Sequence, residues 1–258
     1  MDTFTLSLPL LCMICFFVFL AGFVDAAAGG GGLISLPAYI ASGMPVHMAY
    51  GGNKFSSACG TTLASVRFFK NRSMDVKVAL LAAAGSFIGS GIAAHIVLML
   101  DDQILKRIVI IFLPVAAAVI FLNRGYGTEN HSDGLSKRQK IVFSLLIGLL
   151  IGFYDGMVGP GTGTFAIIAF SILMKYDLKM ASGNAKLLNL ASNYASLITY
   201  AVNGNVFWIA AVPAAFCNVL GSYFGSGLAL KKGAAFIRPM ILCVMILLMF
   251  KLVSDIIL

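Results

Sequence analysis

Charged residues are scarce in this chain of 258 residues. Asp, Glu, Lys and Arg make up 11% of it, whereas a soluble domain carries about 25%. Hydrophobic residues make up 60%, and the mean hydropathy is +0.96. This balance excludes an ordinary water-soluble domain. Apolar runs that alone or with their flanks could cross a bilayer lie at 5–24, 78–100, 108–122, 141–154, 206–230 and 239–250. The sequence therefore predicts an all-α polytopic membrane protein.

The residue patterns that most enzymes and metal sites need are also missing. The three histidines, His47, His95 and His131, are scattered without the spacing of metal ligands, so no metal site is expected. The sequence contains no motif of a zinc protease, a serine hydrolase or a P-loop ATPase. The five cysteines all lie in apolar segments, where packing is the simplest interpretation. We expect neither an enzyme nor a cofactor.

The two halves of the chain repeat each other. Three motifs recur in the same order, with offsets that drift only from 130 to 136 residues. They are GFVD at 22–25 and GFYD at 152–155, AYGGNK at 49–54 and ASGNAK at 181–186, and GSFIGSG at 85–91 and GSYFGSG at 221–227. Ordered matches of this kind indicate a duplication. They divide the chain into a first membrane repeat at 1–123, a linker at 124–138 and a second membrane repeat at 139–258.

Each repeat is expected to contain a helix hairpin broken at glycines, followed by three longer transmembrane helices. The first repeat is predicted to have helices at 5–25, 29–42, 46–69, 76–99 and 103–122. The second is predicted to have helices at 139–155, 159–174, 179–202, 205–230 and 234–257. The paired GSFIGSG and GSYFGSG motifs are interpreted as small-residue surfaces for close helix packing.

Basic residues occupy opposite loops in the two repeats. The loop at 70–77 has three basic residues, whereas its equivalent at 203–206 has none. Conversely, the basic pair at 231–232 corresponds to an acidic pair at 101–102. Because basic loops of membrane proteins face the cytoplasm, the repeats are predicted to have inverted topology, with a cytoplasmic linker and both termini external. The net charge of +8 is thereby interpreted as a topology signal and not as a nucleic-acid surface.

The glycine runs GGGG at 29–32 and GPGTG at 159–163 interrupt the hairpins. A helix can break inside a membrane only where protein or a water-filled cavity surrounds the break. The amides at the start of the next helix carry positive partial charge and can receive an anion. The alternative is that these glycines only allow helices to pack closely. The backbone candidates for substrate binding are Gly30, Gly31, Gly32, Gly161, Thr162 and Gly163.

Four charged residues, Asp25, Lys54, Asp155 and Lys186, lie within apolar segments as two repeat-related pairs. Each opposes insertion by about 2.5 to 3.5 kcal/mol, which normally marks an ion path or an ion pair. The lysines either contact an anionic substrate or neutralise the Asp of their own repeat, and the two roles are compatible. The aspartates either accept hydrogen bonds that hold the glycine turns or take up protons during transport.

A polar stripe follows each intramembrane lysine. Asn189 and Asn193 lie three and seven residues after Lys186, on one helix face, and the matching residues of the first repeat are Ser57 and Thr61. The stripes predict either a lined cavity or hydrogen bonds between helices. The side-chain candidates for substrate binding are Asn53, Lys54, Ser57, Lys186, Asn189 and Asn193.

The duplicated segments at 22–54 and 152–193 closely resemble the TauE/SafE sulfite exporter family, and most of all its YfcA-like branch. The resemblance covers nearly the whole chain. It implies a permease of the bacterial inner membrane that moves a small sulfur-containing anion, such as sulfite or a sulfonate, with proton or ion coupling. One departure is Gly52, which stands where family members often carry Thr.

Together these features predict a secondary transporter that works by alternating access. An anion channel and a non-transporting membrane accessory protein are the alternatives. The expected partners are a small anionic substrate, the lipid bilayer and, in a homo-oligomer, further copies of the chain. No nucleic-acid partner is expected.

Overall fold

The computed structural model describes residues 6–100, 104, 127 and 129–257, and every regular element in this part of the chain is helical. A short 3-10 turn, η1 (Ser132–Gly134), precedes the second half. The α-helices are α1 (Leu8–Ala28), α2 (Gly32–Ala41), α3 (Val46–Lys70), α4 (Val76–Leu98), α6 (Lys137–Met157), α7 (Thr162–Leu173), α8 (Leu178–Val202), α9 (Trp208–Lys232) and α10 (Ala234–Ile257). Apart from residue 104, the helix predicted at 103–122 lies outside the described residues, as does the acidic pair at 101–102.

Side-chain caps explain where several helices begin. Ser136 and Gln139 form a capping box, which starts α6 at Lys137, two residues before the predicted boundary. Asp177 accepts hydrogen bonds from the amides of Lys179 and Met180 and so starts α8. The starts of α6 and α8 are therefore set by side chains that satisfy free amides of the first turn.

Four helices, α1, α4, α6 and α9, are long and apolar enough to cross a membrane. Large apolar side chains on them are exposed, among them Phe16, Ile88, Leu150 and Phe216. A surface of this kind is suited to lipid and not to water. These findings agree with a polytopic membrane protein.

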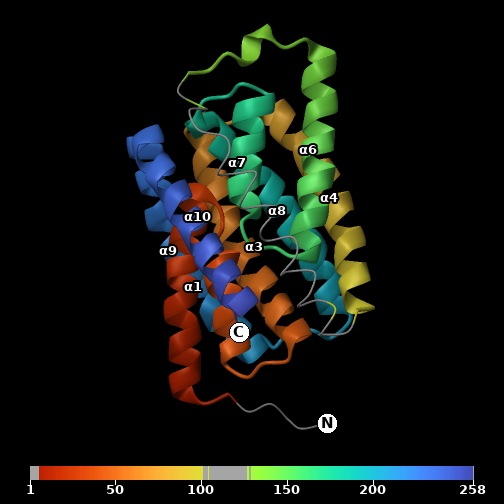
Figure 1. The fold of residues 1–258 in the computed structure, drawn as a ribbon, viewed down its shortest axis with the longest axis vertical. Coiled ribbons are helices and arrows are strands. Elements are labelled where there is room, and N and C mark those ends of the chain that lie inside the picture. Colours follow the sequence, from red (N-terminus) through yellow and green to blue (C-terminus); the bar gives the residue numbers. More distant parts are fainter. Residues whose placement is uncertain (1–5, 101–103, 105–126, 128, 258) are drawn as a thin grey trace.

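Helices α3 and α8 form a central pair, around which the other helices pack. The structure places α1, α9 and α10 on one side and α4 and α6 on the other, with α3, α7 and α8 between them (Figure 1). The most extensive packing joins α4 to α6 and α1 to α9, while α3 packs on α8. In the same view α1 begins at the lower end of the molecule and α6 at the upper end, so these two helices run in opposite directions (Figure 1).

Glycines allow the outer helices to approach closely. A Cβ atom at Gly89 of α4 would overlap the backbone of Leu149 in α6. A Cβ atom at Gly225 of α9 would overlap the backbone of Phe23 in α1. The predicted role of the two repeated glycine motifs in close helix packing is therefore confirmed.

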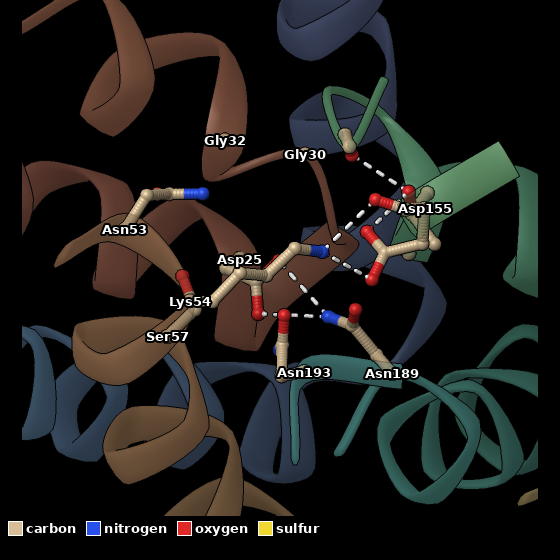
Figure 2. Close-up of a pocket in the computed structure, with 12 residues that line it drawn as sticks. Asp25, Gly30, Gly32, Asn53, Lys54, Ser57, Asp155, Asn189 and Asn193 are labelled. Atoms are coloured by element: carbon tan, nitrogen blue, oxygen red, sulfur yellow. Dashed lines mark hydrogen bonds and ion pairs between the residues drawn. The ribbon is translucent and has the colours of Figure 1, made fainter. Parts of the chain in front are cut away.

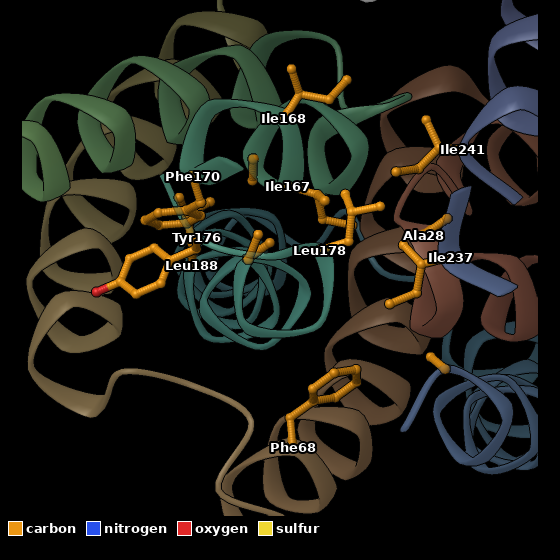
Figure 3. Packing of buried hydrophobic residues seen from close by; sticks show 14 of the residues in the cluster. Ala28, Phe68, Ile167, Ile168, Phe170, Tyr176, Leu178, Leu188, Ile237 and Ile241 are labelled. Atoms are coloured by element: carbon orange, nitrogen blue, oxygen red, sulfur yellow. The ribbon is translucent and has the colours of Figure 1, made fainter. Parts of the chain in front are cut away.

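Two apolar clusters lie toward the two ends of the central helices. One contains Phe68 near the end of α3 together with Leu178 and Leu188 of α8 and residues of α7 and α10 (Figure 3). The other contains Tyr50 near the start of α3 and Tyr200 near the end of α8. The middle of α3, between the clusters, carries polar residues described next. In the middle of α8, the polar residues alternate with Ala185 and Leu188 of the first cluster.

The glycine contacts predict opposite effects of one substitution at two positions of α4. Gly89→Ala should lower the melting temperature of the detergent-solubilised protein, because overpacking costs about 1–3 kcal/mol. Gly91→Ala is the matched control, since its Cβ would lie 4.0 Å from that of Ala195. The control should keep or slightly raise the melting temperature, because alanine favours a helix by up to about 1 kcal/mol over glycine. Equal melting temperatures for the two variants would contradict the packing.

Candidate functional site

The first hairpin breaks at the predicted glycine run, three residues later than the expected helix bounds. Helix α1 ends at Ala28 and α2 begins at Gly32. Between them Gly29 and Gly30 have φ angles of 74° and 100°, a region that residues with a Cβ atom rarely adopt. Glycine is therefore required here by the backbone conformation itself, in addition to any role in packing.

The second hairpin breaks at the equivalent place. Helix α6 ends at Met157 and α7 begins at Thr162. Gly159 and Gly161 both have a φ of 85°, so this break also depends on left-handed backbone. The Tyr154 hydroxyl donates to the carbonyl oxygen of Pro160 at 2.7 Å and holds the connecting segment.

The two breaks meet. The Thr164 hydroxyl, in the first turn of α7, lies 2.9 Å from the carbonyl oxygen of Ala28 and 3.0 Å from that of Gly29. A Cβ atom at Gly29 would overlap the backbone of Gly163. The backbone groups left free at the end of α1 thus find a partner in the opposite half, which shields them from lipid.

Each intramembrane aspartate contacts the break that follows it. The Thr162 hydroxyl donates to Asp155 Oδ1 at 2.8 Å. The Gly31 amide donates to Asp25 Oδ1 at 3.4 Å. These contacts support the predicted role of the aspartates in holding the glycine turns, more tightly in the second half than in the first.

The lysines pair across the two halves. Lys54 Nζ lies 2.6 Å from Asp155 Oδ2 and 3.0 Å from the Asp155 carbonyl oxygen, with both side chains buried (Figure 2). Lys186 Nζ donates to the carbonyl oxygen of Asp25 and lies 3.9 Å from Asp25 Oδ2. The interpretation that each lysine neutralises the Asp of its own repeat is therefore wrong. The lysines pair in this way because α3 approaches the second break and α8 approaches the first, so the carboxylate nearest to each lysine belongs to the other half.

A small polar cavity of about 20 Å³ lies among these groups (Figure 2). By this measure a single water needs about 10–15 Å³, so the cavity has room for about one water molecule. Its lining residues are Asp25, Gly30, Gly32, Asn53, Lys54, Ser57, Asp155, Gly159, Thr162, Gly163, Asn189 and Asn193. The structure thus brings together candidates that are far apart in the sequence.

Three predicted candidates do not line this cavity. The amide of Gly31 faces Asp25, and Gly161 serves as the left-handed residue that starts α7. The ammonium of Lys186 is fully buried against the Asp25 carbonyl oxygen. Gly159 lines the cavity but was not predicted to do so, although it belongs to the same glycine run.

The polar stripes of α3 and α8 face each other. Asn193 Nδ2 lies 3.5 Å from Thr61 Oγ1, and Asn193 also lines the cavity beside Ser57. Ser35 of α2 donates to Asn53 Oδ1 at 2.5 Å, which fixes that side chain at the cavity wall. The two interpretations of the stripes, a lined cavity and hydrogen bonds between helices, therefore both describe the structure.

Gly52 has a steric role in this chain. A Cβ atom there would lie 3.1 Å from Cε1 of the fully buried Tyr39 ring. A larger residue would press on Tyr39, whose hydroxyl contacts Ser56 at 3.4 Å. Gly52 does not line the cavity, so the missing hydroxyl removes no group from its wall.

Comparison with known proteins shows that this chain is similar to one family of membrane proteins. A model of the sulfite exporter TauE/SafE family matches residues 14–252. A probable membrane transporter protein of Haemophilus influenzae is 33% identical over 251 residues, covering 97% of each chain. The probable membrane transporter protein YfcA of Escherichia coli is 35% identical over 248 residues, covering 96% of this chain and 91% of the relative. No solved structure gives a significant match.

The ion pair across the halves predicts a specific energetic coupling. Lys54→Met or Asp155→Asn alone should lower the free energy of unfolding by about 3–5 kcal/mol, because each variant leaves the other residue of the pair as an uncompensated buried charge. The double variant should lose less than the sum, by about 1–3 kcal/mol. Denaturant titration of the detergent-solubilised protein measures each value.

The control is the same cycle with Lys54→Met and Asp25→Asn, the two residues of one repeat. Its coupling should be the smaller of the two. A larger coupling of Lys54 to Asp25 than to Asp155 would contradict the pairing.

Proposed function

The chain belongs to the sulfite exporter TauE/SafE family, and we propose that it is a secondary transporter of a small sulfur-containing anion such as sulfite or a sulfonate. The carrying observation is that two glycine-broken hairpins, one from each half, meet at a buried polar cavity inside an apolar helical protein. The family description supports the substrate class, and the relatives are named as transporters, which supports a role other than catalysis.

The finer architecture that we propose is a pair of inverted repeats at 1–123 and 139–258, joined by a cytoplasmic linker at 124–138. The opposite directions of α1 and α6 support it (Figure 1). The packing supports it as well, because α1 packs on α9 as its repeat equivalent α6 packs on α4. Inverted repeats with broken helices at their interface are common in secondary transporters.

The cavity has donors suited to an oxyanion. The first turns of α2 and α7, at Gly32 and Thr162, reach its wall, and a helix start carries about half a positive charge. The amides of Asn53, Asn189 and Asn193 add hydrogen-bonding side chains. We therefore propose these groups, together with Lys54 and Lys186, as the residues that recognise the anion.

The small size of the cavity favours a carrier over a channel. A sulfite ion is larger than the single water molecule for which the cavity has room. The apolar clusters around Phe68 and Tyr50 lie toward the two ends of α3, on either side of the polar middle. Access from either face would therefore need a rearrangement, as alternating access requires.

We further propose that the protein lies in the inner membrane with its basic turns in the cytoplasm and both termini external. The Tyr176 hydroxyl donates to Asp75 Oδ2 at 2.7 Å. This contact brings the basic turns at 70–77 and 175–179 to the same end of the molecule. A shared basic end is the arrangement that the positive-inside rule describes.

The orientation predicts the labelling of two single cysteines, in a background in which the five native cysteines are replaced by alanine. Val202→Cys, at an exposed position, should react with a membrane-impermeant maleimide in intact spheroplasts. Lys70→Cys, at the opposite end of the molecule, should react only after permeabilisation. The reverse pattern would contradict the proposed orientation.

The proposed substrate class predicts the behaviour of reconstituted protein. Wild-type proteoliposomes should show saturable counterflow of radiolabelled sulfite or a small sulfonate. Lys54→Ala and Lys186→Ala should each reduce counterflow at least about tenfold, because a lost charge-assisted hydrogen bond costs about 1.5–3 kcal/mol. Wild-type flux in both variants would reject the anion site.

Two controls keep the result interpretable. Lys77→Ala removes an exposed lysine at the start of α4 and should retain wild-type flux. Asn193→Leu keeps all four intramembrane charges while removing an amide from the cavity wall, so reduced flux there does not depend on a broken ion pair. Flux without saturation or counterflow would favour an anion channel, and no flux of any tested anion would favour an accessory protein.

A further inference from the structure

The two repeat-related aspartates lie in unequal surroundings. The carboxylate of Asp155 has an ammonium at 2.6 Å and a hydroxyl at 2.8 Å, from Lys54 and Thr162, and its side chain is 4% exposed. Short charge-assisted bonds of this kind stabilise the ionised form. The Asp155 carboxylate is therefore held by two short hydrogen bonds.

The carboxylate of Asp25 has only long contacts among the described residues. The Gly31 amide lies at 3.4 Å, Asn189 Nδ2 at 3.4 and 3.5 Å, and Lys186 Nζ at 3.9 Å. Lys186 directs its ammonium to the backbone oxygen of Asp25 instead. The Asp25 side chain is 16% exposed and lines the cavity, so a proton carried by a water molecule there can reach it.

The sequence itself encodes this difference. Aligning GFVD with GFYD places Thr162, whose hydroxyl binds Asp155, opposite Gly32 of the first repeat. Gly32 has no side chain with which to bind Asp25. The unequal hydrogen bonding therefore follows from a residue that differs between the repeats.

We propose that Asp25 is the proton-binding site of this transporter, and that Asp155 stays ionised as the fixed partner of Lys54. This assignment rests on the proposed function and names the group that couples it to protons. The charged groups that face Asp25 are Lys186 of α8 and, across the cavity, Lys54 of α3 and Asp155 of α6.

Charge balance explains how the proton would act. With all four groups ionised, the two lysines and two aspartates sum to zero, and the cavity wall itself carries two carboxylates and one ammonium. Protonation of Asp25 removes one negative charge and leaves Lys186 uncompensated. An anion then restores neutrality, so proton and anion each favour the binding of the other. A monovalent anion and its proton would cross together without net charge.

The neighbours of Asp25 favour a proton over a metal cation. The nearest polar groups are an amide N–H, a side-chain NH₂ and an ammonium, which present hydrogens to the carboxylate. Hard cations instead require several oxygen ligands at short range. The surroundings of Asp25 therefore do not suit a metal cation as the coupling ion.

The first arm of the test needs no substrate. Infrared difference spectra between acid and alkaline pH should contain the carbonyl band of a protonated carboxylic acid in the purified wild-type protein. Asp25→Asn should remove a component of this band, while Asp155→Asn, the repeat-related control, should retain that component. Loss of the component in Asp155→Asn and its presence in Asp25→Asn would overturn the assignment.

The second arm measures the coupling with methanesulfonate, which stays a monovalent anion over the working pH range. For one linked proton, the wild-type dissociation constant should rise by up to about tenfold per pH unit as the pH increases. Asp25→Asn should abolish this pH dependence, whatever its absolute affinity, whereas Asp25→Glu should restore it. A pH dependence that persists in Asp25→Asn would overturn the assignment.

The two arms separate the proposals. If the wild-type protein neither binds nor transports any sulfur anion, the proposed substrate fails, and the infrared component still decides whether Asp25 holds a proton. If anions bind without pH dependence, the transporter stands and the proton site at Asp25 fails.

Discussion

Charges buried in a low-dielectric interior must be compensated, and in this chain the compensation comes from the opposite half. Lys54 reaches Asp155, and Lys186 reaches Asp25. An unpaired charge at such a depth costs several kcal/mol. Neither half alone can therefore bury its own lysine and aspartate in this arrangement. The two pairs tie the halves together and fix where the broken helices meet.

The rest of the architecture follows from placing those pairs inside a membrane. A broken helix exposes backbone groups that lipid cannot satisfy, so the break must be enclosed by protein. The Thr164 hydroxyl and the close approach of Gly29 to Gly163 enclose the breaks from within the hairpins. The polar helices α3 and α8 then cover them, and the apolar helices α1, α4, α6 and α9 form the surface outside.

Features set by local sequence could be predicted, whereas features set by the choice of a distant partner could not. Left-handed glycines and flanking apolar runs are local, which is why the sequence identifies the glycine run at each helix break and predicts the bounds of α3, α4, α8 and α10 to within one residue. It places both breaks two to three residues too early. The start of α6 was misplaced by two residues because the capping box of Ser136 and Gln139 extends the helix. The interpretation that Lys54 neutralises the Asp of its own repeat is wrong because a pair within one repeat and a pair between repeats leave the same sequence pattern. Likewise, nothing near Gly52 in the sequence indicates that the Tyr39 ring lies against it.

Duplication explains why such a site can hold both a fixed and a responsive charge. Two identical copies would surround their aspartates identically, and both carboxylates would then bind a proton with equal affinity. Replacing one residue, Thr162 against Gly32, gives one carboxylate a short hydrogen bond and leaves the other with contacts of 3.4 Å or more. The ion pair that is kept tight maintains the contact between the halves during any movement. The looser pair can then lose its negative charge without separating the halves. The unpaired positive charge of Lys186 then attracts an anion.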